Sequence, residues 1–104
     1  MRRRSVAALA LAAWAAGSLP ALAQSGPDTA RYVAANCANC HGTTGVAKGA
    51  MPSLAGLSKD RIAENMRAFR DGKRPATIMH QIAKGYSDAQ IDAVAAHFAA
   101  QKAR

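Results

Sequence analysis

The sequence predicts an all-α domain with four helices and one long glycine-rich loop. Apolar residues recur three or four positions apart in separate segments, which is the spacing of one helix face. Ser58 and Ser87 precede two of these segments as N-caps, and Gln90 completes a capping box with Ser87. No stretch shows a sustained alternation of β-branched and polar residues, so we expect no strands.

The first 23 residues have the features of a cleaved secretory signal peptide. Arg2 to Arg4 form a basic start, residues 6–17 are apolar, and Ala21-Leu22-Ala23 is a small-residue cleavage site. The apolar run is shorter than the roughly 20 residues that a spanning helix needs, although an uncleaved N-terminal anchor is the alternative. Cleavage leaves one exported, periplasmic domain, residues 24–104, without a membrane anchor.

The mature chain is expected to begin with a helix and a long loop. Asp28 is placed to cap a helix through residues 29–37. Residues 41–57 then contain four glycines and Pro52, which indicates an irregular loop. A loop of this length in a small domain is usually functional or wrapped round another group.

Three further helices complete the expected fold. The second covers residues 59–71 and ends near Gly72, and the third is a short helix at 78–84 with Thr77 as its cap. The fourth runs from residue 88 to about residue 102. Its inner face comprises Ile91, Val94, Ala95 and Phe98.

The mature chain is short of core-forming side chains. Much of its apolar content is alanine, and its four aromatic residues are Tyr32, Phe69, Tyr86 and Phe98. A domain of roughly 80 residues or fewer usually needs a disulfide, a metal or a cofactor for stability. We therefore expect a bound group to complete the interior.

The charge is positive but dispersed. Loss of the leader arginines leaves eleven of the fourteen basic residues against six acidic ones. They stand among acids and alanines without interleaved aromatic residues, which argues against a nucleic-acid groove. A basic turn that contains Arg70, Lys73 and Arg74 would face an acidic partner or simply be solvated.

Both cysteines of the chain stand in the segment "CANCH", residues 37–41. A disulfide across two residues would stabilise little, and a structural zinc site needs four ligands. A redox dithiol usually accompanies a βαβ unit, so a redox-active dithiol protein without haem is the minor alternative. The spacing C-x-x-C-H is that of c-type haem attachment. Cys37 and Cys40 would bind the porphyrin, and His41 would meet its iron.

The sixth iron ligand has several candidates. Met51 lies only ten residues beyond His41, and Met66 falls on a helix face expected to form core. Met79 lies 38 residues beyond His41, after a whole helix.

Two histidines compete with the methionines. His80 adjoins Met79, and His97 lies on the last helix beside Phe98. Ligation of the iron by two histidines is therefore an alternative, although His97 is expected to be an exposed surface residue.

The mature chain resembles the class I cytochromes c over its whole length. "CANCHG" is similar to the family's haem motif, which makes Cys37 and Cys40 the thioether residues and His41 the proximal ligand. The resemblance implies a small fold of about four helices wrapped round one covalent haem c.

The resemblance also assigns the haem surroundings. "MPSLAG" is similar to the family's proximal-loop segment, which implies that the carbonyl of Pro52 accepts the Nδ1–H of His41 and that Leu54 contacts the haem. Met79 falls where the family places its distal methionine.

A narrower resemblance covers residues 69–99. This stretch, with "RPATIM" and "AKGYSD", is similar to the cytochrome subunit of flavocytochrome c sulfide dehydrogenases. That subunit takes electrons from an FAD-containing partner that oxidises sulfide. His80 departs from the pattern, in which a small residue is more usual.

The expected function is electron transfer in the periplasm. Histidine and methionine ligation leaves no open iron site, and thioether sulfur raises the reduction potential. The sequence contains no nucleophile and base pair, so the chain is not expected to be an enzyme by itself. It would accept electrons from the FAD-containing sulfide dehydrogenase subunit or act as a freely diffusing monohaem shuttle.

Overall fold

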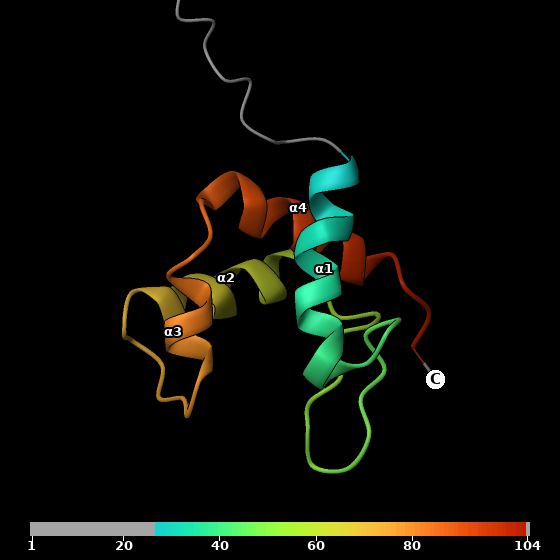
Figure 1. Cartoon of the computed structure of the whole chain (residues 1–104), viewed down its shortest axis with the longest axis horizontal. Helices are drawn as coiled ribbons and strands as arrows, with labels where there is room; N and C mark the ends of the chain where they lie inside the picture. The colour runs from blue at the N-terminus through green and yellow to red at the C-terminus, as the bar shows by residue number, and fades with distance from the viewer. Residues whose placement is uncertain (1–26, 104) are drawn as a thin grey trace, which may run out of the picture.

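The computed structural model describes residues 27–103, which form four helices and no strand (Figure 1). The helices are α1 (Pro27–His41), α2 (Lys59–Arg70), α3 (Met79–Ala83) and α4 (Asp88–Ala99). α4 packs against both α1 and α2, and α3 packs against α2. The predicted all-α class is confirmed. None of these described helices is long and apolar enough to cross a membrane, and the expected signal peptide at residues 1–23 lies outside the described part.

Side-chain caps start two helices as predicted. The Oγ of Ser58 accepts a hydrogen bond from the backbone N–H of Arg61 at 3.2 Å. The Oγ of Ser87 accepts from the N–H of Gln90 at 3.2 Å, and the side chain of Gln90 accepts from the N–H of Ser87 at 2.9 Å. The capping box therefore satisfies two backbone donors at the start of α4.

α1 is longer than expected at both ends. It begins at Pro27, because proline suits the first helical position, so Asp28 lies in the first turn and is not the N-cap. It continues to His41, and Gly42 then turns the chain with a φ of +88°. The motif of residues 37–41 thus forms the last turn of a helix.

α3 and α4 are shorter than expected. Ile78 is the N-cap residue of α3 and no side chain caps the helix there, so the prediction for Thr77 is wrong. α4 ends at Ala99, and the N–H of Ala100 bonds back to Ala96 and Phe98.

The core lies where α4 meets α1 and α2 (Figure 1). Alanines at several of these contacts let the helices approach closely. The predicted inner face of α4 is confirmed, since its four residues are at most 2 % exposed. His97 is half-buried and packs edge-on against Phe98, with ring centres 5.2 Å apart, so it is not the exposed residue that was expected. The buried cluster comprises Val33, Ala34, Ile62, Ala63, Met66, Ala83, Ile91, Val94, Ala95 and Phe98.

The long loop between α1 and α2 closes on itself at Gly45 and is bonded to α4 at Gly56, whose N–H donates to the carbonyl of Phe98 at 3.2 Å. The carbonyl of Gly45 accepts hydrogen bonds from the N–H groups of Leu54 at 2.8 Å and Ala55 at 3.0 Å. Gly45 has a φ of +80°, and a Cβ there would lie 2.7 Å from the ring of Phe98. The loop therefore doubles back beneath the end of α1 and fixes the position of residues 51–54.

Candidate haem-binding site

A cavity of about 410 Å³ lies between the end of α1, the loop at residues 51–54 and the segment 74–82. Its inner wall comes from α2 and α4. Figure 1 shows the end of α1 and α3 on opposite sides of this region. The wall is mostly apolar, with inner residues Ile62, Met66, Val94 and Phe98.

The cavity brings together the six haem-binding residues that the family resemblance assigns. Three of these residues lie at the end of α1, two lie on the loop and one lies at the start of α3. They are therefore brought together by the fold from distant parts of the chain. They are Cys37, Cys40, His41, Pro52, Leu54 and Met79.

The two cysteines lie one helical turn apart and are not bridged to each other. The Sγ of Cys37 donates to the carbonyl of Val33 at 3.4 Å. Burial raises the pKa of the Cys37 thiol, and this outweighs a backbone hydrogen bond that lowers it. A redox-active dithiol requires a thiolate of lowered pKa. The surroundings of Cys37 therefore do not favour its thiolate.

The imidazole of His41 is buried, with 7 % of the residue exposed, and its orientation is fixed. Its Nδ1 lies 2.7 Å from the carbonyl oxygen of Pro52. Because a carbonyl can only accept, Nδ1 carries the proton and donates it, which leaves the lone pair of Nε2 free for a metal. Metal-binding histidines are commonly held in this way. The contact is the one that the family resemblance implies.

Three methionines line the cavity, and their surroundings differ. Met66 is 7 % exposed and belongs to the core cluster. Met51 precedes Pro52, so it stands on the same side of the cavity as the proximal contact of His41. Met79 comes from α3, on the other side. Of the histidines in the described residues, only His41 lines the cavity; His80 and His97 do not.

One charged residue of the cavity was missed as a site residue. The guanidinium of Arg74 lies 5.0 Å from the centre of the Phe69 ring, and both side chains line the cavity. One feature of the sequence could have indicated its place in the site, because Arg74 stands shortly before Met79 in the chain. Arg70, expected in the same docking turn, instead bonds Asp88 at 2.8 Å and Asp71 at 3.2 Å.

The family comparison agrees with this geometry. The profile of the family described as "Cytochrome C oxidase, cbb3-type, subunit III" matches residues 24–98. The chain belongs to the class I cytochromes c. Its cofactor is covalently bound haem c, and the paired thiols, the free Nε2 and the apolar cavity fit that group.

Two relatives of this cytochrome are named for the dehydrogenases of sulfur compounds that they serve. The cytochrome is 38 % identical to the cytochrome subunit of sulfide dehydrogenase of Chlorobaculum tepidum, over 61 % of this chain and 57 % of that one. It is 38 % identical to the thiosulfate dehydrogenase electron acceptor of Thiomonas intermedia, over 98 % of this chain and 45 % of that one. The cytochrome thus spans about half the length of these relatives. It is a monohaem-type electron-transfer protein related to both.

A solved structure supports the fold. Cytochrome c4 of Acidithiobacillus ferrooxidans is 32 % identical and superposes with a TM-score of 0.62, over 68 % of this chain and 49 % of that one.

Proposed function

We propose that this cytochrome carries single electrons through a haem held in the cavity by thioether bonds to Cys37 and Cys40. In this proposal, His41 is the proximal ligand and Met79 the distal one. The observation that carries it is that one apolar cavity gathers these four side chains from α1 and α3, with Nε2 of His41 left free.

Each residue has a defined role in this proposal. Haem c supplies one-electron exchange at its iron. Pro52 holds the imidazole through its carbonyl and makes it a stronger donor. Leu54 and the apolar residues of α2 and α4 keep water from the inner face.

In this proposal the protein works in the periplasm, to which residues 1–23 would direct it as a signal peptide. The proposed electron donor is an FAD-containing sulfide dehydrogenase subunit. The support for this donor is the resemblance of residues 69–99 and the relationship to a cytochrome subunit of sulfide dehydrogenase.

The apolar residues at the rim of the cavity favour a stable association with a partner protein. Met51, Ile78 and Ile82 line the cavity and are 42 %, 58 % and 36 % exposed. Exposed apolar residues at one mouth are typical of an interface centre.

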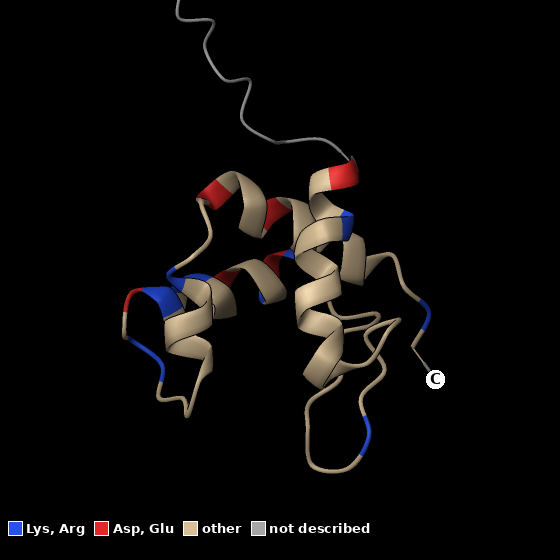
Figure 2. Cartoon of the chain, in the orientation of Figure 1, with Lys and Arg blue, Asp and Glu red and all other residues tan. Residues whose placement is uncertain are grey.

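The charges around this rim are of one sign. Residues 42–57 and 72–87 contain Lys and Arg but neither Asp nor Glu. The acidic residues of the described chain lie on α1, α2, the turn after α2 and α4 (Figure 2). A partner with an acidic border round an apolar centre would match this surface. The basic residues are Lys48, Lys73, Arg74 and Lys84.

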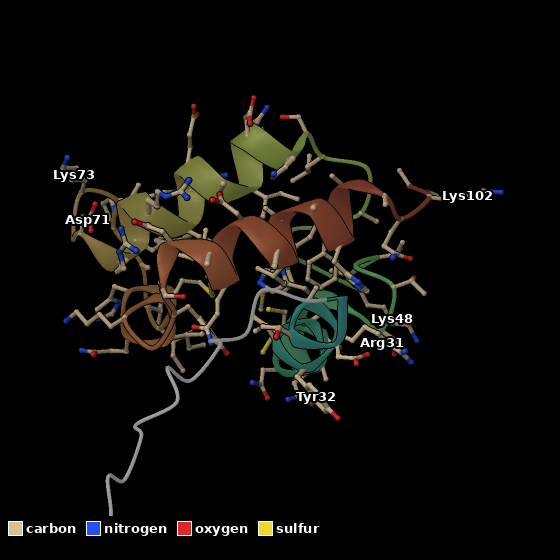
Figure 3. All side chains as sticks on the ribbon, turned by 90° about the horizontal axis from the view of Figure 1, so that it is seen from above. Arg31, Tyr32, Lys48, Asp71, Lys73 and Lys102 are labelled. Atoms are coloured by element: carbon tan, nitrogen blue, oxygen red, sulfur yellow. The ribbon has the colours of Figure 1, made fainter. Side chains whose placement is uncertain are left out.

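Isolation of the complex from the native periplasm tests the donor. We expect an FAD protein to stay bound in high salt and to reduce the haem when sulfide is added. Ile78→Ser with Ile82→Ser should weaken the complex. Tyr32→Ser is the control, since Tyr32 is 77 % exposed but points away from the rest of the molecule (Figure 3). Retention of the complex by the rim variant would contradict the proposed interface.

A freely diffusing shuttle is the second candidate. The relationship to an electron acceptor of thiosulfate dehydrogenase, over 98 % of this chain, favours it. Such a shuttle would dock mainly through Lys48, Lys73 and Lys84, so its binding would fall as salt screens these charges. Reduction by thiosulfate and its dehydrogenase, without retained flavin and without a response to sulfide, would support the shuttle.

A further inference from the structure

We propose that the hydrogen bond between Asn36 and Tyr86 is a latch that keeps Met79 on the iron and external ligands off it. This rests on the proposed ligation of the haem by Met79. The Nδ2 of Asn36 donates to the hydroxyl oxygen of Tyr86 at 3.2 Å, although the two residues are fifty positions apart in the chain. Asn36 lies on α1 and lines the cavity, whereas Tyr86 lies in the turn between α3 and α4. The bond therefore joins the proximal side of the cavity to the distal side.

This bond connects two parts of the fold that are otherwise separate. α1 packs against α4 and α3 packs against α2, but α1 and α3, both fully described, do not pack against each other. Residues 27–57 and 74–87 are described throughout, and no ion pair and no other hydrogen bond joins these two ranges. The two helices that carry the proposed iron ligands thus have a single polar tie between their sides of the cavity.

Met79 depends on this tie because α3 is weakly held at the end where Met79 stands. α3 has five residues, no side chain caps its start, and Ile78 at that start is 58 % exposed. A helix of one or two turns is not stable by itself.

The other end of α3 is firmly held and includes the latch. Ala83 is buried in the core cluster, and the N–H of Tyr86 donates to the carbonyl of Ala83 at 3.2 Å. The side chain of Tyr86 also packs against the core cluster. A tie at Tyr86 therefore acts on α3 as a unit and sets how close Met79 stays to the side of the cavity formed by α1.

A latch of this kind shifts an equilibrium between two states of the site. In one state Met79 is bound to the iron, and in the other Met79 has moved away and the position is open. An external ligand binds the open state, so its apparent affinity is reduced by the fraction of molecules that are open. The net contribution of one hydrogen bond changes that fraction about 2- to 10-fold. Loss of the latch should raise the apparent affinity by the same factor.

Titration of the ferric holo-protein with imidazole tests the latch. Tyr86→Phe removes the hydroxyl and keeps the ring, and Asn36→Ala removes the donor. Each variant should bind imidazole about 2- to 10-fold more tightly than the wild type. The double variant should bind it no more tightly than either single variant, because both changes break the same bond. The methionine–iron charge-transfer band should disappear at correspondingly lower imidazole concentrations.

Two matched controls change the same residue types on α1 without breaking this bond. Tyr32→Phe removes the hydroxyl of a residue that is 77 % exposed. Asn39→Ala removes an amide whose Nδ2 donates to the backbone carbonyl of Asn36 within the same helix. Both controls should bind imidazole as the wild type does.

Unchanged imidazole affinity in Tyr86→Phe, or additive effects in the double variant, would overturn the proposal. An equal rise in Asn39→Ala would overturn it as well, because a general loosening of α1 would then be the cause. If Tyr86→Phe does not assemble, the comparison of Asn36→Ala with Asn39→Ala decides. A methionine–iron band that is absent from the wild type, or that survives in Met79→Ala, would instead be a failure of the proposed ligation.

Discussion

Nδ1 of His41 and the carbonyl oxygen of Pro52 lie 2.7 Å apart, although the two residues are eleven positions apart in the chain. The contact joins the last turn of α1 to a loop that is itself anchored on α4. The N–H of Gly56 donates to the carbonyl of Phe98, and Gly45 packs closely against the Phe98 ring. The direction of the His41 imidazole therefore depends on how the loop packs against α4.

Substitution of Gly45 should disturb this arrangement more than substitution of Gly49. Gly45→Ala combines a strained φ of +80° with a Cβ at 2.7 Å from Phe98 and 2.9 Å from the nitrogen of Ala55. We expect the free energy of unfolding to fall by about 2–4 kcal/mol, from strain and overpacking together. Denaturant unfolding of the holo-protein measures this loss, and the NMR signal of the His41 Nδ1–H should shift.

Gly49→Ala is the matched control. Gly49 has a φ of +65°, but a Cβ there would meet no atom within 4 Å. Strain alone should cost about 1 kcal/mol. Equal losses in the two variants would show that the loop does not pack on Phe98 as described.

The methionines should separate into a ligand, a rim residue and a core residue. Met79→Ala should remove the methionine–iron charge-transfer band from the ferric spectrum and lower the reduction potential, because thioether ligation raises it. Met51→Ala should keep the band. Met66→Ala should keep the band but lose about 2–5 kcal/mol of stability, as a buried side chain is truncated. Loss of the band in Met51→Ala alone would make Met51 the ligand.

The fold should depend on the haem. The cavity of about 410 Å³ lies against a core in which four of the ten buried residues are alanines. Without the bound group, the remaining burial should not offset the roughly 1–2 kcal/mol per residue of backbone entropy. Cys37→Ala with Cys40→Ala, prepared without haem, should show weak helical circular dichroism and fast proteolysis. Cooperative melting at the temperature of the holo-protein would contradict this dependence.

Acid should remove one stabilising cluster. Hydrogen bonds from Arg70 and then Arg67 lower the pKa of Asp88 below its ordinary value. A lowered carboxyl pKa contributes stability above the ordinary value, and this contribution is lost as the pH falls through the lowered one. Asp88→Asn should therefore melt below the wild type near neutral pH, and the difference should vanish in acid.

Asp28→Asn is the control for this pH series. Asp28 also stands in the first turn of a helix, but it has no ion pair among the residues that the structure describes. Its substitution removes the interaction with the helix dipole alone. If both variants show the same pH profile, the arginine pairs contribute nothing to the stability of α4.

The sequence was sufficient for features with a local cause. Ser58, Ser87 and Gln90 make their hydrogen bonds within three residues, so the starts of α2 and α4 could be predicted. The period of apolar residues likewise identified the buried face of α4. The family resemblance supplied the contact between His41 and Pro52, which spans a loop and has no local signal.

Features that depend on the fold were missed. Asp28 and Thr77 are both residue types that often cap helices. α1 nevertheless begins one residue before Asp28, because Pro27 suits a first turn, and α3 begins one residue later than predicted, with Ile78 at its N-cap position. The placement of Arg74 over Phe69 depends on the turn after α2, which no periodicity describes. His97 was expected on the surface but packs on Phe98, its neighbour in the chain.

Peptide mass spectrometry of the purified protein tests the central assignment most directly. Trypsin cleavage after Arg31 and Lys48 releases residues 32–48, which contain Cys37, Cys40 and His41. The assignment predicts this peptide with the added mass of one haem, stable to denaturation and reduction. The unmodified peptide, or the peptide lacking only the two hydrogens of a disulfide, would contradict it.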